Sequence, residues 1–265
     1  MKVGFFDKRL FKIFLQITSV VSAALSTLLL FVDLPDEYKT LALAVWIWSN
    51  QLNRVEIKID GTSVSIKVGD IFMQPGLKAI AFNEYFDTQV DNRIISEKSL
   101  NGLFVKSHLK IPVEELDQKI ASFVFEEDEV LGPTEKMRQG KNIKYRLGTA
   151  YVYEDYLLTA MSKFDDSNRA VLTMPEYLEF LVRFWDQVNK VYAQQSVSTP
   201  IFGSGITRIK GHKNISDEDL LKIMLWTFRI SEMRFKYPAN LSIIIHKDKI
   251  DKINLLDMKL LNNGV

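Results

Sequence analysis

Residues 174–202 read MPEYLEFLVRFWDQVNKVYAQQSVSTPIF, a long helical pattern that leads into a strand pattern. The first part, residues 174–192, predicts a helix, and Pro175 stands in its first turn, where a proline is tolerated. The second part, residues 196–202, predicts a strand that runs into the turn sequence GSG. A helix that leads into a strand is the repeating unit of an α/β domain.

Similar patterns flank this stretch on both sides. Strands are predicted at VEIKI (55–59), SVSIKV (63–68), KAIAF (78–82), YLLTAMSKF (156–164) and LSIIIH (241–246). The first two form a hairpin, because Asp60-Gly61 between them is a turn signal. The last is apolar throughout, as expected for a central strand that is covered on both faces.

Two further helices complete the alternation. Ser216 with Asp219 three residues later predicts a helix cap, with the helix running to about Met233, and residues 250–261 predict a last helix. Residues 126–142, EEDEVLGPTEKMRQGKN, are polar and predict a surface loop. Strands that alternate with helices indicate an α/β fold with a mixed or mostly parallel sheet and helices on both faces.

The charge balance and the missing residue types exclude several classes of protein. The chain has 265 residues, with 34 Lys and Arg against 33 Asp and Glu, so it lacks the basic excess of a general nucleic-acid binder. It contains no Cys, which excludes disulfides, Cys-ligated zinc, iron–sulfur clusters and cysteine nucleophiles. His108, His212 and His246 are far apart in sequence, which argues against a His-based metal site. We therefore expect no nucleic-acid partner and no metal.

Residues 13–32 read IFLQITSVVSAALSTLLLFV, which is 20 residues without a charge. A helix of this length rises about 30 Å, the thickness of a bilayer core, so the stretch predicts a membrane-spanning helix. A signal peptide would have a shorter apolar run and a small-residue cleavage site after it. A buried soluble helix of this composition is uncommon. Ser19, Ser22, Ala23 and Ser26 share one face, which favours close packing against another helix.

A second, shorter apolar stretch follows a polar turn. Residues 40–52 read TLALAVWIWSNQL, and the polar residues before them extend the predicted helix to about 36–52. This length is at the lower limit for a span, so the helix is either a short span or an interfacial return helix. Basic residues precede the first stretch and follow the second, while acidic residues fill the turn, so both termini are expected in the cytoplasm. Residues 1–52 are thus predicted to form a membrane hairpin in the inner membrane, as a multi-pass anchor for a cytoplasmic domain of residues 53–265.

Polar side chains and glycines follow three of the predicted strands. Asp70 comes after residues 63–68, Asn83 comes after residues 78–82, and Gly-Ser-Gly follows residues 196–202. In an open α/β sheet, ligands bind outside the carboxyl ends of the strands. A carboxylate, an amide and a Gly-rich loop at one rim suit a nucleotide, because they can bind an exocyclic amine, a ribose hydroxyl and phosphates respectively.

Each of these signals also has a plainer interpretation. Gly-Asp after a strand is commonly a turn, Gly-Ser-Gly is commonly a tight turn, and Arg208 is either a phosphate partner or a solvated charge. The GSG sequence is not a Rossmann fingerprint, because the third Gly is missing and the next helix begins about ten residues later. It is not a P-loop, because no Gly-Lys-Ser/Thr follows.

Taken together, the motifs resemble a known family. VGDI, AIAFN and STPIFGSGI resemble the ligand rim of macro domains, which are modules that bind ADP-ribose and its derivatives. This resemblance implies a three-layer α/β/α macro domain with a mixed sheet, preceded by the α-helical membrane hairpin. The longer motifs KVGDIF, AIAFNEYFDTQVD, RIISEKSLNG, YLLTAMSKFD and PIFGSGITRI are similar to the macro domains of Thoeris antiphage defence effectors. One branch of that family carries an N-terminal pair of membrane helices, and the resemblance covers nearly the whole chain.

The resemblance implies roles for particular residues. Asp70 would contact the adenine amine, with Ile71 beside it, and Asn83 would face the distal ribose. The diphosphate would be wrapped by Gly203, Ser204, Gly205 and Ile206. The variable end of the ligand would lie near Asp87, Thr88, Ser99, Asn101 and Gly102. Hydrolytic macro domains usually have two Asn and a Gly-rich run at this point, whereas this chain has the bulky segment 84–87, which favours binding without turnover.

The resemblance also implies a function and competing alternatives. The chain would be a membrane-anchored effector that binds an ADP-ribose-derived signal, such as histidine-ADP-ribose, made from NAD by a partner TIR protein. Binding would drive homo-oligomeric assembly, membrane disruption and cell death or growth arrest, without a catalytic residue or a cofactor. One alternative is a membrane-anchored hydrolase of ADP-ribose conjugates, with Asp87 and Glu84 as possible bases. Another is a membrane scaffold that binds no nucleotide.

Overall fold

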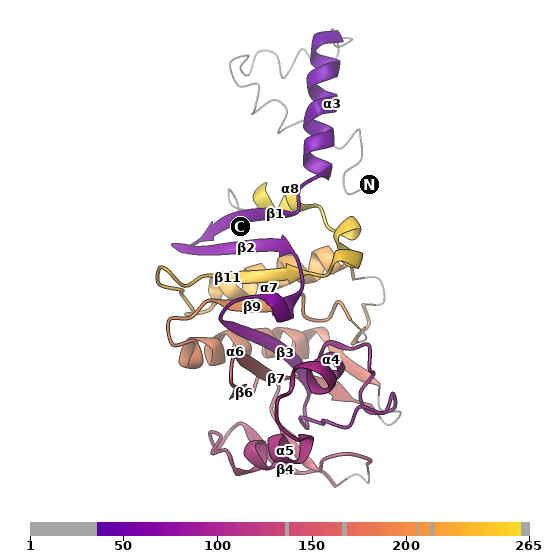
Figure 1. Ribbon diagram of the computed structural model, residues 1–265, viewed down its shortest axis with the longest axis vertical. Helices are drawn as coiled ribbons and strands as arrows, with labels where there is room; N and C mark the ends of the chain where they lie inside the picture. The colour runs from indigo at the N-terminus through magenta and orange to yellow at the C-terminus, as the bar shows by residue number, and fades with distance from the viewer. Residues whose placement is uncertain (1–35, 136–137, 166–168, 206, 213–214, 261–265) are drawn as a thin grey trace.

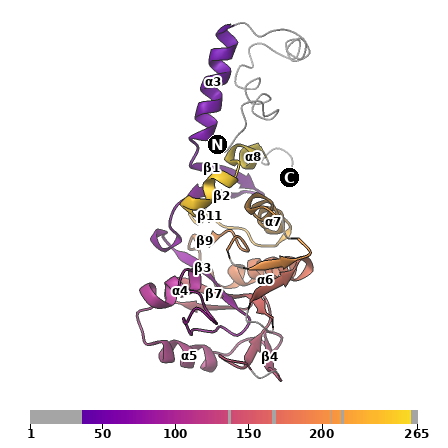
Figure 2. The same ribbon diagram turned by 90° about the vertical axis from the view of Figure 1, so that its right-hand side faces the viewer.

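The computed structural model of the chain describes residues 36–135, 138–165, 169–205, 207–212 and 215–260. The predicted spanning helix of residues 13–32 lies outside the described residues, and so does Ile206. The predicted second helix, about 36–52, is helix α3 (Asp36–Asn50), which has 15 residues. In Figures 1 and 2, α3 extends away from the sheet at the end where β1 lies. Among the described residues, no helix combines the length and apolar character needed to cross a membrane.

The described part of the chain is built around one mixed sheet of nine strands. Eight of them follow the spatial order β1-β2-β11-β9-β3-β7-β8-β10, and β6 also pairs with β7. The strands are β1 (Arg54–Ile59), β2 (Thr62–Val68), β3 (Leu77–Asn83), β6 (Ala150–Tyr153), β7 (Tyr156–Phe164), β8 (Ala170–Thr173), β9 (Val197–Pro200), β10 (Arg208–Lys210) and β11 (Leu241–Ile245). A separate two-stranded ribbon joins β4 (Val130–Pro133) and β5 (Ile143–Tyr145).

Parallel pairing dominates the centre of the sheet. β2, β11, β9, β3 and β7 are each parallel to the next in that order, and β8 is parallel to β10. The pairs β1–β2, β6–β7 and β7–β8 are antiparallel. The alternating patterns predicted a mixed or mostly parallel sheet, and the mixed sheet implied by the macro-domain resemblance is confirmed.

Helices lie on both faces of the sheet. The helical elements other than α3 are α4 (Leu100–Leu103), α5 (Val113–Ser122), α6 (Met174–Val191), α7 (Asp217–Ile230), α8 (Leu255–Leu260), the 3₁₀-helices η1 (Ile71–Met73) and η3 (Lys247–Lys252), and the π-helix η2 (Phe104–His108). In Figure 2, α6 and α7 lie on the side of the sheet away from α4. The alternating side chains of β3 divide between two cores: Leu77 and Ala79 pack with α6 and α7, whereas Ile80 and Phe82 pack with η2 and α5.

The sequence-predicted elements agree with the structure in most places and fail in two. The six predicted strands and the helices capped at Thr173 and Ser216 are present, and both caps are complete capping boxes. The predicted last helix over 250–261 is wrong, because the chain forms η3 and α8 separately, and the Asn254 side chain accepts a hydrogen bond from the Leu256 N–H (3.1 Å) at the start of α8. The predicted surface loop over 126–142 is also wrong in part, since it contains β4 and Arg138, whose side chain is 8% exposed.

We expect the capping box of α6 to make stability depend on pH. Glu176 accepts hydrogen bonds from the Thr173 backbone N–H (2.6 Å) and the Lys163 ammonium (2.7 Å). Burial by itself would raise the pKa of this carboxyl, but these partners lower it to about 2. Because the folded pKa lies below the ordinary value of 4.5, the stabilisation is complete above pH 4.5 and is lost as the pH falls toward 2.

Glu176→Gln should therefore lower the free energy of unfolding by about 1 kcal/mol at pH 7. Urea unfolding followed by circular dichroism should show the difference from the parent chain disappearing between pH 4.5 and pH 2. Glu232→Gln, at an exposed carboxylate, is the matched control and should change little at either pH. A difference in the free energy of unfolding that stayed constant over this pH range would contradict the lowered pKa of Glu176 in the folded chain.

Candidate functional site

Parallel pairing brings the predicted rim residues to one edge of the sheet. Val68, the last residue of β2, is opposite Ile245 of β11, and Ile244 is opposite Pro200, the last residue of β9. Asn83, the last residue of β3, is opposite Ser162 of β7. The segments that follow β2, β3 and β9 thus leave the sheet on the same side, as the strand patterns indicate.

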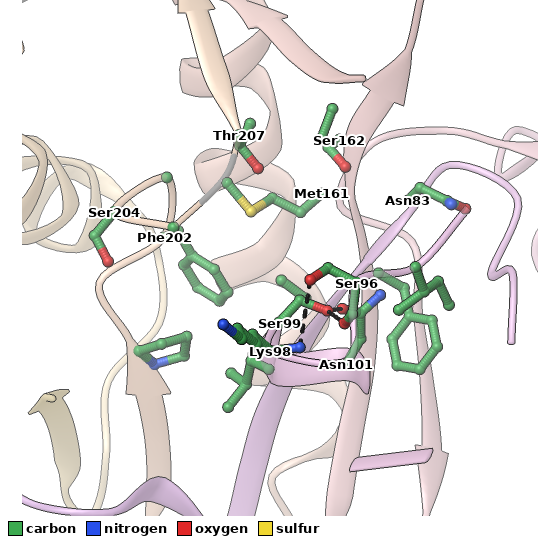
Figure 3. Close-up of a pocket in the computed structure, with 18 of the residues that line it drawn as sticks. Asn83, Ser96, Lys98, Ser99, Asn101, Met161, Ser162, Phe202, Ser204 and Thr207 are labelled. Atoms are coloured by element: carbon green, nitrogen blue, oxygen red, sulfur yellow. Dashed lines mark hydrogen bonds between the residues drawn. The ribbon is translucent and has the colours of Figure 1, made fainter. Parts of the chain in front are cut away.

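A cavity of about 220 Å³ opens at this edge, between the segment 94–101 and the loop after β9. Figure 3 shows Ser96, Lys98 and Ser99 on one side and Phe202 and Ser204 on the other. The remaining lining comes from the ends of β3, β7, β8 and β9 and from Thr207. We call this space the rim cavity and residues 201–205 the GSG loop. Of the predicted site residues, the rim cavity is lined by Asn83, Ser99, Asn101, Gly203, Ser204 and Gly205.

Two side chains hold the GSG loop by hydrogen bonds to its backbone carbonyls. The Tyr177 hydroxyl on α6 donates to the Phe202 carbonyl (2.8 Å), and the Lys249 ammonium on η3 donates to the Ser204 carbonyl (2.8 Å). Burial raises the pKa of Tyr177, so its hydroxyl stays protonated as a donor. Because the Phe202 and Ser204 carbonyls accept these hydrogen bonds, the GSG loop keeps a fixed orientation.

The N–H groups of Gly203 and Gly205 make no hydrogen bond within the described residues. Gly203 has φ +84°, a left-handed conformation that favours glycine. The N–H of Ser204, which lies between them, donates to the Ile201 carbonyl (3.2 Å), so two unpaired N–H groups flank this turn. Unpaired N–H groups of a glycine turn favour an anion. The GSG loop can therefore bind phosphate oxygens.

Lys98 is a site residue that the sequence interpretation missed. It lines the rim cavity opposite the GSG loop, its side chain is exposed, and none of the described carboxylates pairs with it. An ammonium group on the wall opposite this loop adds to the preference for an anion. Its position in RIISEKSLNG was a usable signal, because the neighbouring Ser99 and Asn101 were already predicted site residues.

Ser99, Asn101 and Gly102 form the start of α4 beside Lys98. The Ser99 hydroxyl lies 2.5 Å from the Ser96 carbonyl and 2.6 Å from Asn101 Oδ1, and it accepts from the Gly102 N–H (3.2 Å). A Cβ on Gly102 would lie 2.2 Å from the Ser96 carbonyl oxygen, so only glycine fits. Gly102 therefore positions this wall of the rim cavity without lining it.

Asn83 lines the rim cavity but uses its side chain to hold the turn after β3. Its Oδ1 accepts from the backbone N–H groups of Tyr85 (3.0 Å) and Asp87 (3.2 Å), and its Nδ2 donates to Asp87 Oδ2 (2.9 Å). Within the turn, Phe86 has φ +49°, which is unusual for a bulky residue, and its side chain is fully buried. The bulky segment 84–87, which follows AFN, is thus packed into the interior of the protein.

Asp87 and Thr88 lie in a buried polar network and do not line the rim cavity. Asp87 is 1% exposed, forms an ion pair with Arg138 (2.5 Å) and accepts from the Lys141 N–H (2.8 Å). Thr88 donates to Asp117, which also pairs with the Lys141 ammonium (2.5 Å). Burial lowers the pKa of Lys141, while Asp117 and Asp87 oppose that shift. Asp87 and Thr88 therefore hold neighbouring segments of the chain in place, through Arg138 and Asp117.

The other predicted residues lie at the rim but outside this lining. Asp70 is exposed, and its Oδ1 accepts from the Phe72 N–H (2.9 Å), while Ile71 is buried beside it. Neither residue lines the rim cavity. Arg208 is exposed at the start of β10 and lines a neighbouring cavity.

The carboxylates considered as general bases are both buried and paired. Asp87 pairs with Arg138, and Glu84, which is 2% exposed, pairs with Lys144 (3.2 Å). Burial raises the pKa of Glu84, and Lys144 opposes the shift. Neither carboxylate lines the rim cavity. The described residues contain no group of three or more His, Asp or Glu side chains placed to bind a metal ion.

Comparison with known proteins adds independent information. The family described as "Thoeris protein ThsA, Macro domain" matches residues 64–246. The Thoeris protein ThsA of Bacillus amyloliquefaciens (strain Y2) is 36% identical over 271 residues, which is 96% of this chain and 90% of that protein. Two solved structures are also similar: a point mutant of the Oceanobacillus iheyensis macrodomain (13% identity, 80% of this chain and 95% of that one, TM-score 0.47) and the same macrodomain with ADP (13%, 80% and 98%, TM-score 0.45).

We expect Asp87→Asn to lower the free energy of unfolding by about 3 kcal/mol, because it leaves the Arg138 guanidinium, whose side chain is only 8% exposed, without a compensating charge. Lys98→Gln, on the exposed wall of the rim cavity, should change it by less than about 0.5 kcal/mol. Urea unfolding at pH 7 measures both. A loss below about 1 kcal/mol for Asp87→Asn would show that the Asp87–Arg138 pair does not support the fold.

Proposed function

Because the chain belongs to the Thoeris ThsA family, we propose that it is an antiphage defence effector whose macro domain binds an ADP-ribose-derived signal at the rim cavity. The GSG loop would bind the diphosphate through its free N–H groups, with Lys98 opposite. Asp70, which follows β2 and is separated from β9 by β11, would bind the adenine amine. Asn83, Ser99 and Asn101 would surround the remaining sugar and its substituent.

One observation carries this proposal. The rim cavity, at the carboxyl ends of parallel strands, is lined by Gly203 and Gly205, whose N–H groups make no hydrogen bond within the described residues, and by Lys98, which pairs with none of the described carboxylates. Fixed donors of this kind select a phosphate group without any catalytic side chain. The Tyr177 and Lys249 contacts support affinity, since they orient the GSG loop before a ligand arrives.

The geometry favours binding over turnover. A general base must reach the proton that it removes, either directly or through one water. Glu84 and Asp87 are instead buried in ion pairs outside the lining of the rim cavity. The alternative function, hydrolysis of an ADP-ribose conjugate, would need these carboxylates to leave their partners.

The remaining parts of the proposal rest on the sequence. Residues 13–32 would anchor the chain in the inner membrane, with α3 as the second segment of the anchor and the macro domain in the cytoplasm. A partner TIR protein would make the signal from NAD, and histidine-ADP-ribose is one candidate. Binding would favour a homo-oligomer that disrupts the membrane, which requires that the signal bind the assembled state more tightly than the resting state.

We expect the full-length chain, in detergent solution, to bind at least one of ADP-ribose, NAD and histidine-ADP-ribose in calorimetric titration. Lys98→Gln should weaken this binding about tenfold, because it removes one charge-assisted contact. Lys236→Gln, at another exposed lysine, is the matched control and should bind as the parent chain does. Chromatography after the titration should recover the ligand unchanged.

Two results would contradict the proposal. If none of the three nucleotides bound, the rim cavity would not be a site for an ADP-ribose-type ligand. If the ligand bound but was converted with multiple turnovers, the hydrolase alternative would replace signal binding.

A second prediction concerns assembly. Ser22→Leu places a bulky side chain on the predicted small-residue face of residues 13–32 and should block killing of infected cells, while nucleotide affinity stays unchanged. Ala24→Leu, on another part of the same stretch, is the control. Survival after infection and calorimetric titration measure the two effects. Unchanged killing in Ser22→Leu would refute this packing surface.

A further inference from the structure

A second cavity, of about 760 Å³, lies on the other side of the GSG loop. It is bounded by the GSG loop, β10, the start of α7 and η3. Its lining includes five basic residues and, among the described residues, one carboxylate. The basic residues are Arg208, Lys210, His212, Lys249 and Lys252, and the carboxylate is Asp217. We call this space the basic cavity.

Among the described residues that line the basic cavity, basic side chains outnumber acidic ones. Asp217 pairs with Lys249 (3.1 Å), which also donates to the Ser204 carbonyl. The described residues provide no carboxylate partner for Arg208, Lys210 or Lys252, all of which are exposed. Like charges that line one concave space repel each other, and a concave space focuses their field. An anion with several negative charges would relieve that repulsion.

The basic cavity is distinct from the rim cavity. The rim cavity lies between the GSG loop and the segment 94–101, whereas the basic cavity lies between the same loop and α7. The connection from the GSG loop to α7 includes β10, which supplies Arg208 and Lys210. The start of α7 is already capped by its own Ser216 and Asp219, so the side chains, and not the helix end, make this site basic.

We propose that the basic cavity is a second, regulatory anion site that binds a triphosphate group. Its volume falls in the range of small-molecule sites. Arg208, Lys210 and Lys252, which pair with no described carboxylate, match a group with three or more negative charges. Inorganic polyphosphate and nucleoside triphosphates share this chemistry. The triphosphate site does not depend on the proposed function, whereas its linkage to ligand binding in the rim cavity rests on that function.

The two cavities share a wall, because Gly203, Ser204, Gly205 and Thr207 line both. Two anions on opposite sides of one loop repel each other, and each loop N–H can point to only one of them. Occupation of the rim cavity should therefore weaken binding in the basic cavity, and linkage requires the reverse effect to be equal.

The test is calorimetric titration of the full-length chain with inorganic tripolyphosphate and, separately, with ATP, without divalent cations. Lys210→Gln/Lys252→Gln should weaken tripolyphosphate binding at least tenfold. Arg229→Gln/Lys236→Gln removes the same charge near the opposite end of α7 and should bind as the parent chain does. Circular dichroism checks that both variants are folded. Equal affinities for the two ligands would indicate that the phosphates alone are recognised, and tighter binding of ATP would indicate a nucleotide; both support the site.

Three results would overturn the second site: no binding of either ligand, equal weakening in both double variants, or loss of tripolyphosphate binding in Lys98→Gln, which would place that ligand in the rim cavity. The linkage has its own test. Saturating ADP-ribose should weaken tripolyphosphate binding about fivefold and then no further, whereas competition for one site would weaken it without limit. Unchanged affinity in the presence of bound ADP-ribose would overturn the linkage. If ADP-ribose does not bind at all, the proposed function fails while the tripolyphosphate titration still decides the second site.

Discussion

The parallel pairing of β11 with β2 on one side and β9 on the other is the constraint on which the rest of the structure depends. β11 comes from the end of the chain and is buried along its whole length, so it joins early and late segments through backbone hydrogen bonds and apolar packing. This pairing sets the register at which β2 and β9 end. The Asp70 turn and the GSG loop therefore emerge at the same edge, although they are far apart in sequence.

The side chains behind the rim cavity are as important as those that line it. Tyr177 and Lys249 hold the two carbonyls of the GSG loop, while Asn83 and the Asp87–Arg138 pair hold the turn after β3. These contacts fix the backbone before any ligand binds. Lys249 has a second consequence, because it joins the GSG loop to Asp217 and so connects the rim cavity to the basic cavity.

The sequence predicted the regular elements well wherever local pattern and tertiary packing agreed. Strands with a clear apolar pattern, such as YLLTAMSKF, and helices with a capping box, such as the one that begins after Thr173, agree with the structure. The short strands β8 and β10 were missed, because three or four residues carry too little pattern. The segment 126–142 was predicted as a surface loop because it is polar, yet Arg138 is buried against Asp87, a partner 51 residues away.

What the sequence determined by itself was the α/β class, the order of the main strands and helices, and the family, because periodicity, caps and motifs are local properties of the chain. The tertiary structure alone decided the role of each site residue. It placed Asp87 and Thr88 in a buried network, brought Lys98 to face the GSG loop, and gathered Arg208, Lys210 and Lys252 around a second cavity. The physical reason is that ion pairing and burial depend on distances between segments that are remote in sequence, and no local pattern encodes those distances.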